Sequence, residues 1–424
     1  GNSGKVGYPD PAMTAPTATA PPAAKSALLP VDDALARVLD GVRPLGPEHV
    51  PLTEAAGRTL AHDLAAALTN PPFDVSSMDG YAVRAADLKA APVTLKLAGE
   101  SAAGWPYAGS VRPGEAVRIF TGAALPDGAD TIVIQENTSA SADAVRILEL
   151  AHKGANVRWR GGDFHEGDTV LAAGTRLTAR HILLAATAGH AMLATVRKPV
   201  VAILATGDEL IEPSDRPMAG QIVASNSYGL AALIAAAGGE PRLIGIARDT
   251  PEDLAQKFEE ASSADILITT GGASVGDHDL VRPALEAWGA KLDFYKIAMR
   301  PGKPLFFGRN GAMRVLGLPG NPLASIIGAR IFLIPLITRL LGRTDTITPI
   351  SATLTVPIEA NGPRTHYMRA LLDTSSAGAR VTPFGGQDSS FVRALAQANC
   401  LAVIPADAPA LPEGSPINVL PLDF

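Results

Sequence analysis

The chain has 424 residues, of which 47% are hydrophobic and 18% charged, and its net charge is −6. Because domains usually span about 100–200 residues, this length predicts about two to four domains with sizeable cores. The acidic balance and the lack of any Lys/Arg run exclude a general nucleic-acid footprint. A single cysteine, Cys400, excludes an intrachain disulfide and a cysteine-rich zinc site, and it indicates a reducing compartment, the cytoplasm.

The first part of the chain predicts a tail followed by two interleaved domains. Residues 1–30 are rich in Ala, Pro, Thr and Ser without a hydrophobic period, which predicts a disordered tail. Residues 71–155 alternate short strand patterns with turns, which indicates a small β domain. We expect this domain to be inserted between the two halves of a composite N-terminal domain, residues 31–70 and 156–197.

From residue 198 to residue 345, apolar strand patterns alternate with helical ones. This alternation of strand and helix patterns predicts an α/β domain with a mostly parallel sheet covered on both faces. One helix should end at Gly238-Gly239, and the next should begin with Thr250 as N-cap and with Asp253 completing a capping box. Residues 346–424 predict a separate small β domain.

The longest apolar tract, residues 326–341, contains Arg330, Pro335 and Arg339. These residues indicate a kinked, buried helix instead of a membrane span. No compact apolar segment near the N-terminus has the pattern of a signal peptide.

Four polar loops follow strands of the predicted α/β sheet, at residues 206–209, 248–249, 271–279 and 318–322. Ligands of open α/β sheets bind beyond the carboxyl ends of the strands, so these loops should face one crevice. Each loop alone has an ordinary explanation as a tight turn, a helix cap or a solvated acidic pair. Four of them on one sheet favour a binding site.

The residue types in these loops suit an anionic ligand that carries phosphate. Glu209, Asp277 and Asp279 offer hard oxygen ligands for Mg²⁺, which binds through one or two carboxylates plus substrate phosphates. Backbone N–H groups of Gly271-Gly272 and of the helix starting at Pro322 can receive phosphate oxygens. Arg300 and Lys303, in RPGKP, add two cations to a proline-stiffened loop.

Several common enzyme classes lack their motifs in this sequence. There is no G-x-x-x-x-G-K-[ST] phosphate loop, no G-x-G-x-x-G fingerprint, no G-x-S-x-G elbow and no HExxH zinc motif. Residues 72–83, PFDVSSMDGYAV, remain unexplained, because they place carboxylates and hydroxyls in a stretch too polar and irregular for a core element.

PFDVSSMDGYAV, IFTGAALPDGAD, RGGDFHEGD, ATGDEL, TTGGASVGDHD, RPGKP and GLPGNP occur in this order. The ordered set resembles the molybdopterin molybdenumtransferases of molybdenum cofactor biosynthesis, from about residue 30 to the C-terminus. The resemblance implies a multidomain α/β plus β protein that consumes adenylated molybdopterin and molybdate, with Mg²⁺, and releases AMP and molybdenum cofactor. It also implies a homodimer with shared active sites, supplied by a molybdopterin adenylyltransferase.

The resemblance assigns roles to individual positions. The catalytic group would comprise Asp79, Thr121, Asp163 and Asp249, and the metal ligands would be Glu209, Asp277 and Asp279. Substrate would be bound by Gly271, Gly272, Ser274, Pro319, Asn321, Pro322, Arg300, Lys303, Arg369, Ser389 and Ser390. Arg300 and Lys303, with Arg369 and the two serines, would form the molybdate group. Arg300 departs from the Lys of many relatives, and its planar fork suits two-point binding of an oxyanion.

Two alternatives stay open at the level of sequence. The molybdopterin adenylyltransferase itself shares the GGASVGDHD stretch, but the extra domains and Asp79 count against it. A non-catalytic scaffold could use the same fold, as in receptor clustering by animal relatives, but a scaffold would not need the full set of acidic residues.

Overall fold

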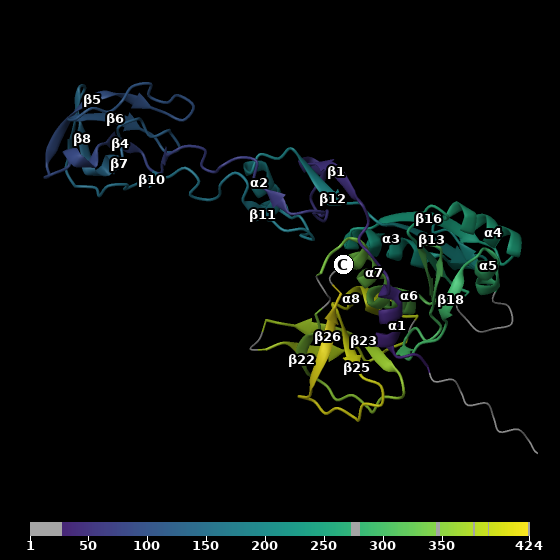
Figure 1. Ribbon diagram of the computed structural model, residues 1–424. Coiled ribbons are helices and arrows are strands. Elements are labelled where there is room, and N and C mark those ends of the chain that lie inside the picture. Colours follow the sequence, from purple (N-terminus) through teal and green to yellow (C-terminus); the bar gives the residue numbers. More distant parts are fainter. Residues whose placement is uncertain (1–27, 273–279, 345–347, 376–377, 389, 423–424) are drawn as a thin grey trace, which may run out of the picture.

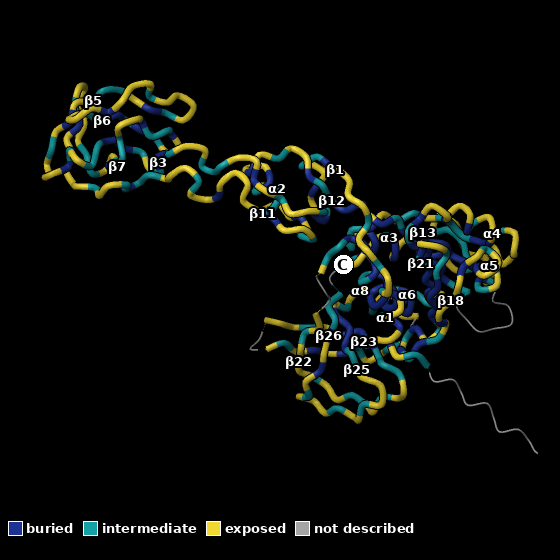
Figure 2. Tube along the Cα trace, viewed as in Figure 1, coloured by how far each residue is buried: buried dark blue, intermediate teal, exposed yellow. Residues whose placement is uncertain are grey.

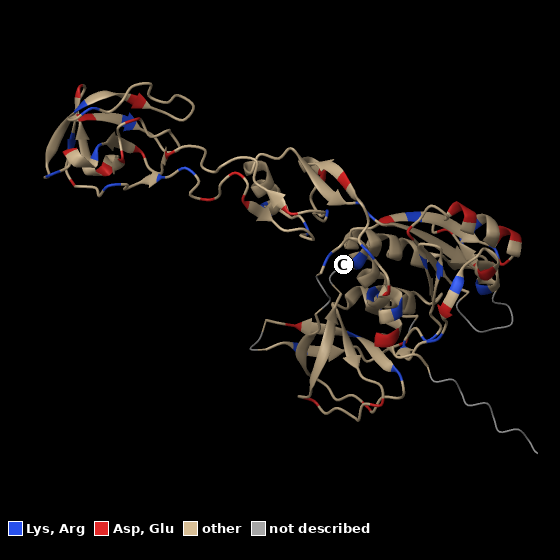
Figure 3. Ribbon diagram, in the orientation of Figure 1, with Lys and Arg blue, Asp and Glu red and all other residues tan. Residues whose placement is uncertain are grey.

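The computed structural model describes residues 28–272, 280–344, 348–375, 378–388 and 390–422. Figure 1 shows an elongated chain, with a β domain at one end, a smaller unit after it, and an α/β body beside a second β domain at the other end. Buried residues are concentrated in the α/β body, whereas the connection between the first two parts is largely exposed (Figure 2). Acidic and basic residues are interspersed along the chain (Figure 3).

The domain at the far end is a six-stranded sheet in the order β7-β4-β6-β5-β9-β8. Its strands are β4 (Gly80–Val83), β5 (Val93–Ser101), β6 (Glu115–Ile119), β7 (Thr131–Ile134), β8 (Thr138–Ala140) and β9 (Ala144–Ile147). A Cβ atom at Gly80 would overlap the carbonyl group of Val133 on the neighbouring strand, so only glycine allows this pairing. β3 (Val75–Ser76) pairs with β10 (Val157–Arg158) where the chain enters and leaves the domain.

The middle unit is assembled from two separate segments of the chain. β1 (Pro47–Pro51) pairs with β12 (Met192–Val196), and β2 (Leu64–Ala65) pairs with β11 (Thr169–Leu171), both antiparallel. Helix α2 (Ala179–Thr187) begins at a capping box formed by Thr178 and His181. Side chains from both segments share one small core. A short 3₁₀ turn at Leu52–Glu54 belongs to this unit, and two others, at Ala85–Asp87 and Gln135–Asn137, belong to the far β domain.

Helix α1 (Val31–Leu39) packs on the α/β body and not on the middle unit, although the sequence assigned residues 31–70 together. Its buried residues recur at helical spacing: Val31, Ala34 and Val38. They join the core cluster that contains Leu336, because a helix of the α/β body covers this apolar stripe. Leu29, within the predicted tail, pairs with Ile297, so ordered structure begins before residue 31.

The α/β body contains a six-stranded sheet in the order β16-β13-β17-β21-β20-β18. The first four strands run parallel, and β20 is antiparallel to both of its neighbours, β21 and β18. The strands are β13 (Val200–Thr206), β16 (Glu240–Ala247), β17 (Ile266–Thr270), β18 (Lys291–Phe294), β20 (Phe306–Asn310) and β21 (Met313–Leu318). A small parallel pair joins β14 (Leu210–Ile211) to β15 (Ile222–Val223).

Helices cover both faces of this sheet, as predicted. They are α3 (Ser225–Ala237), α4 (Pro251–Glu260), α5 (Val281–Ala287), α6 (Pro322–Gly328) and α7 (Ile334–Leu340). α1, α3, α6 and α7 enclose one core cluster, and α4 and α5 enclose the other (Figure 1).

Helix ends follow the sequence signals except at one cap. Gly238 ends α3 in the left-handed conformation with φ 96°. Thr250 caps α4 by accepting the Asp253 N–H at 3.3 Å. The predicted capping box is wrong, because the Asp253 carboxylate accepts the Arg248 N–H at 2.7 Å, while the Thr250 N–H donates to the Arg248 carbonyl at 2.8 Å.

The apolar tract forms one helical stretch, Pro322–Leu340, in which a π-helical segment at Ala329–Leu333 separates α6 from α7. Pro335 follows this segment and lacks the N–H that a regular helix would use. By length and composition the stretch could cross a membrane, but 72% of its most apolar window is buried inside the protein, as in core helices.

The C-terminal domain is a sheet in the order β19-β23-β24-β22-β26-β25, and a β23–β25 pairing gives it a barrel-like form. Its elements are β19 (Met299–Arg300), β22 (Ile350–Leu354), β23 (Thr365–Asp373), β24 (Arg380–Pro383), α8 (Val392–Gln397), β25 (Cys400–Ile404) and β26 (Pro416–Pro421). β19 belongs to the RPGKP segment, which therefore joins the α/β body to this sheet.

Candidate functional site

The carboxyl ends of β13, β16, β17 and β21 meet at one edge of the α/β sheet. Backbone hydrogen bonds connect the loops that follow them. The Gly207 N–H donates to the Ala247 carbonyl at 3.2 Å, and the Gly271 N–H donates to the Leu318 carbonyl at 3.2 Å. The predicted loops 206–209, 248–249 and 318–322 and the start of loop 271–279 therefore lie together, as parallel strand order requires.

Gly271 is needed for this close approach. It adopts φ 95°, and a Cβ atom there would lie 2.5 Å from the Thr206 carbonyl oxygen. A Cβ atom at Gly320 would lie 3.6 Å from the Gly271 Cα, so the loops that contain Pro319 and Gly271 are in contact. The loop edge consequently presents backbone to a ligand. Ser274, Asp277 and Asp279 lie outside the described residues.

The acidic residues of this edge come from two loops. The Asp249 N–H donates to Asp208 Oδ1 at 3.2 Å, which ties the loop after β16 to the loop after β13. The Glu209 carboxylate folds back over Gly207, where a Cβ atom would lie 2.8 Å from Oε1. Across the described ranges no three metal-ligating side chains are grouped. Oxygen donors are nevertheless the chemistry that Mg²⁺ prefers, and Mg²⁺ needs few of them when phosphates supply the rest.

The start of α6 differs from the prediction. The Asn321 side chain accepts the Leu323 N–H at 3.2 Å and the Ala324 N–H at 3.5 Å, and Pro322 has no N–H. The donors expected to receive a phosphate are therefore already satisfied by the cap. Asn226, which the sequence did not point to, supports this loop by donating its Nδ2 to the Gly320 carbonyl at 2.8 Å.

Arg300 and Lys303 are exposed cations on the segment that leads from β19 to β20. Arg300 pairs in register with His366 on β23. Burial, together with the charges of Arg300 and Arg364, lowers the pKa of His366 from 6.5 to about 4. The imidazole is thus neutral at neutral pH among positive charges, and His366 is a neighbour of the cationic loop that the sequence analysis missed.

Arg369, which the resemblance places in the molybdate group, uses most of its guanidinium inside its own domain. Its side chain is fully buried and donates to carbonyl oxygens of the loop at residues 384–391, which we call the Arg369 loop. The acceptors are Phe391 at 2.7 Å, Gly386 at 2.8 Å and Asp388 at 2.9 Å. Its Nε has no partner among the described residues. Burial lowers the pKa of Arg369, opposed by the charge of Asp388.

Ser390 lies on the Arg369 loop, and its N–H and Oγ both donate to Asp388 Oδ1, at 2.8 and 2.6 Å. These bonds lower the pKa of Asp388 and hold the loop in a tight turn. The neighbouring Ser389 lies outside the described residues.

The remaining predicted residues lie in the first two parts of the chain. Asp79 follows β3 in the far β domain, where it accepts the Thr121 N–H and the Thr121 Oγ, both at 2.8 Å. These two bonds hold the pKa of Asp79 below its usual value. Asp163 does not join this pair. It accepts the Asn70 Nδ2 at 3.1 Å and stabilises the two-stranded connection between the far domain and the middle unit.

Figure 1 shows that the Asp79 domain and the loop edge of the α/β sheet stand at opposite ends of one chain, with the middle unit between them. The structure therefore gathers the acidic and glycine loops at one sheet edge, places Arg300 beside β23 of the C-terminal domain, and keeps Asp79 and Thr121 in the far domain.

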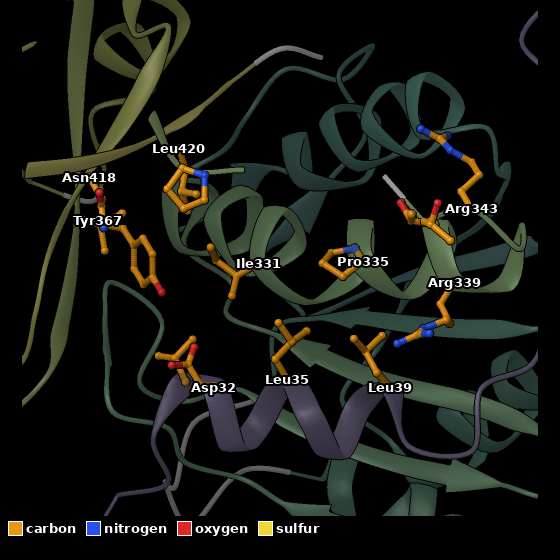
Figure 4. A pocket seen from close by; sticks show the side chains of 15 residues that line it. Asp32, Leu35, Leu39, Ile331, Pro335, Arg339, Arg343, Tyr367, Asn418 and Leu420 are labelled. Atoms are coloured by element: carbon orange, nitrogen blue, oxygen red, sulfur yellow. The ribbon is translucent and has the colours of Figure 1, made fainter. Parts of the chain in front are cut away.

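A separate cavity of about 500 Å³ lies between α1, α7 and the C-terminal domain. Figure 4 shows Leu35, Ile331 and Pro335 forming its apolar middle, with Asp32 and Tyr367 at one end and Arg339 at the other. None of the predicted site residues lines it. No sequence signal pointed to it, because its walls come from three distant segments.

These features define a multidomain α/β protein whose ligand site is built from loops at a sheet edge and from an adjoining β domain. Residues 29–189 match the family described as "MoeA N-terminal region (domain I and II)", residues 202–339 the family "Probable molybdopterin binding domain", and residues 351–422 the family "MoeA C-terminal region (domain IV)". The chain belongs to the MoeA family.

Individual relatives agree with this assignment. The chain is 38% identical over 386 residues to the molybdopterin molybdenumtransferase of Nostoc sp.. The aligned residues cover 88% of this chain and 88% of the relative. It is 37% identical over 402 residues to that of Bacillus subtilis, covering 92% of this chain and 94% of the relative. A crystal structure of the molybdopterin biosynthesis MoeA protein from Pyrococcus horikoshii superposes with a TM-score of 0.82 at 31% identity, covering 94% of this chain and all of that one.

Proposed function

We propose that this chain is a molybdopterin molybdenumtransferase, which consumes adenylated molybdopterin and molybdate and yields AMP and molybdenum cofactor. The observation that carries the proposal is that one chain contains two kinds of anion site. Acidic and glycine loops at the α/β sheet edge suit a nucleotide phosphate, and the exposed cations Arg300 and Lys303 suit an oxyanion. The names of the relatives support the same reaction.

Glu209 and Asp249 would lie at the phosphate end of the substrate. Glu209 would hold Mg²⁺ together with Asp277 and Asp279, which lie outside the described residues, and the ion would also bind the substrate phosphates. When bound, Mg²⁺ would neutralise charge on the phosphate that departs with AMP. The backbone of Gly271 and Gly272 would approach that phosphate closely, because no side chain intervenes.

Molybdate would bind at the cationic end, to Arg300, Lys303 and the Arg369 loop with Ser390. Arg300 can contact two oxygens of the anion at once through its planar fork, while Lys303 acts as a point charge. The neutral state of His366 lets its ring take part as a hydrogen-bonding group without adding charge.

Asp79 and Thr121 would serve the site of a second copy of the chain. Figure 1 supports this arrangement, because these residues stand far from the loop edge of their own chain. In a two-fold homodimer, each far domain can lie over the partner's α/β edge, so both sites are completed at once. Asp163, which braces the connection through Asn70, would set the angle of the far domain.

The test measures product formation by the purified protein. We expect AMP release from adenylated molybdopterin that depends on molybdate, and no pyrophosphate release from ATP with molybdopterin. The reverse pattern would identify an adenylyltransferase, the enzyme class expected to supply the substrate. Absence of both reactions would indicate a scaffold.

A further inference from the structure

The far β domain carries an unusually exposed tryptophan, Trp105. It is 81% exposed, more than any other large hydrophobic residue in the described ranges. Phe120, on the neighbouring strand end, is by contrast covered by the Arg118 guanidinium, which lies 4.9 Å from the centre of its ring. Proteins use the large, flat indole mainly for packing and for binding, and tryptophan is enriched among the residues that contribute most to binding. The exposure of Trp105 therefore indicates a binding role.

Trp105 lies on a tight turn after β5, residues 102–105, which we call the Trp105 turn. The Ala102 N–H donates to the Trp105 carbonyl at 3.0 Å, and the Trp105 N–H donates to the Ala102 carbonyl at 2.9 Å. Gly104 supplies the left-handed conformation of this turn, with φ 78°. Beyond the turn, the Tyr107 ring packs so closely on Gly99 that a Cβ atom there would lie 2.6 Å from it. The backbone of Trp105 is therefore fixed while its side chain is in solvent.

The Trp105 turn stands at the same end of the sheet as Asp79 and Thr121. β5 and β6 are parallel and end side by side, because Ser101 is the register partner of Ile119. β4 is antiparallel to β6 and begins opposite Ile119. Asp79 directly precedes β4, and Thr121 follows β6. The exposed indole and the carboxylate–hydroxyl pair therefore belong to one end of the domain.

The buried Ser101 ties the Trp105 turn to the loop after β6. Its Oγ donates to the Ala124 carbonyl at 2.8 Å and accepts the Tyr107 N–H at 3.4 Å. The Phe120 N–H donates to the Ser101 carbonyl at 3.3 Å. These bonds hold the Trp105 turn in a fixed place beside the loop that carries Thr121. Groups fixed in this way lose little conformational entropy when a ligand binds.

We propose that Trp105 stacks on a flat, fused-ring heterocycle of the substrate that is bound at the loop edge of a second copy of the chain. An indole offers a broad face for such a ring, as aromatic side chains do when they stack on nucleobases. Adenylated molybdopterin carries two such heterocycles, the adenine and the pterin. The inference rests on the proposed function, since Asp79 and Thr121 would bring Trp105 to that site. It adds a substrate-binding residue to the far domain.

The experiment compares Trp105→Phe, Trp105→Leu and Trp105→Ala with the wild-type protein. The half-saturating concentrations of adenylated molybdopterin and of molybdate are each measured from AMP release. Leu148→Ala is the matched control, because it removes an exposed apolar side chain that follows β9, at the opposite end of the same sheet. Thermal unfolding of every variant checks the fold, and sedimentation measures its oligomeric state.

Trp105→Ala and Trp105→Leu should raise the half-saturating concentration of adenylated molybdopterin by about tenfold, as expected for the loss of one stacked ring. Trp105→Phe should raise it by less than about threefold, because phenylalanine keeps an aromatic face. The half-saturating molybdate concentration should change by less than about twofold in all three variants, since molybdate has no ring to stack. Leu148→Ala should behave like the wild-type protein.

Fluorescence provides a measurement that does not depend on turnover. The chain has three tryptophans, so the difference between the emission of the wild-type protein and that of Trp105→Leu isolates the signal of Trp105. Adenylated molybdopterin, added without molybdate, should quench this difference signal. AMP and molybdopterin are then added separately. Quenching by AMP assigns the stacked ring to the adenine, and quenching by molybdopterin assigns it to the pterin.

Three results would overturn the inference while wild-type activity stands. The first is an unchanged half-saturating concentration of adenylated molybdopterin in Trp105→Ala, or no quenching of the Trp105 signal by this substrate. The second is an equal rise for both substrates, which indicates a merely structural role. The third is dissociation of Trp105→Ala into single chains, with activity restored at higher protein concentration, which indicates a contact between copies. Failure of the proposed function is recognised separately, by a wild-type protein that releases no AMP in response to molybdate.

Discussion

Asp79 and Thr121 are joined by two hydrogen bonds of 2.8 Å, one from the backbone N–H and one from the Oγ of Thr121 to the same carboxylate oxygen. The pairing connects the loop after β3 to the loop after β6. It holds Asp79 as an ionised acceptor at neutral pH, because both bonds favour the charged form.

Thr121→Val should raise the pKa of Asp79 toward its ordinary value of 3.8, because the Oγ donor is lost while the backbone donor remains. Because the pKa of Asp79 is lower in the folded than in the unfolded protein, its ionised carboxylate stabilises the domain above pH 3.8. This stabilisation is lost as the pH falls through the folded pKa of Asp79. Carboxyl titration by NMR measures the shift. Thr138→Val, which removes a hydroxyl bond to the Gln135 carbonyl in the same domain, should leave the Asp79 titration unchanged.

Mixing of two inactive variants tests the shared site. Asp79→Asn and Asp249→Asn should each be weakly active alone, and re-equilibrated mixtures should recover activity. A heterodimer would place both lesions in one site and leave the other site intact. Turnover no greater than the average of the two parent variants would show that each site is completed within one chain.

Glu209→Gln should raise the Mg²⁺ concentration for half-maximal AMP release by roughly tenfold, because an amide is a weaker ligand than a carboxylate. Glu212→Gln is the matched control, because Glu212 follows β14 and accepts a hydrogen bond from the Tyr228 hydroxyl at 2.7 Å. An unchanged Mg²⁺ dependence in Glu209→Gln would remove this residue from the metal site.

The half-buried His366 should make the C-terminal region less stable in mild acid. Its folded pKa of about 4 lies below the usual 6.5, so the unfolded state binds more protons between these values. Stability from this group is complete above pH 6.5 and declines as pH falls toward 4. Urea unfolding at pH about 7.5 and about 5 should show a smaller decline for His366→Gln than for the wild-type protein. Equal declines would contradict the assignment, and the exposed His152→Gln should match the wild-type protein.

Local sequence signals were enough for much of the α/β body. The apolar strand runs, Gly238 at the end of α3 and Thr250 at the start of α4 each act within a few residues, so the pattern predicted a parallel sheet with helices on both faces. The loop edge followed from the same logic, since parallel strands that end in polar loops must bring those loops together.

What the sequence by itself determined is therefore the order of elements, the sheet edge and the residue types that can bind phosphate and an oxyanion. Only the tertiary structure decided how individual side chains are used. Arg369 donates to three carbonyl oxygens of a loop that follows it along the chain. The Asn321 side chain accepts N–H groups that a phosphate could have used. Helix α1 packs on the α/β body and not on its sequence neighbours. These outcomes depend on contacts between segments that are distant in the sequence. A buried polar group forms hydrogen bonds with the partners that this packing brings near it.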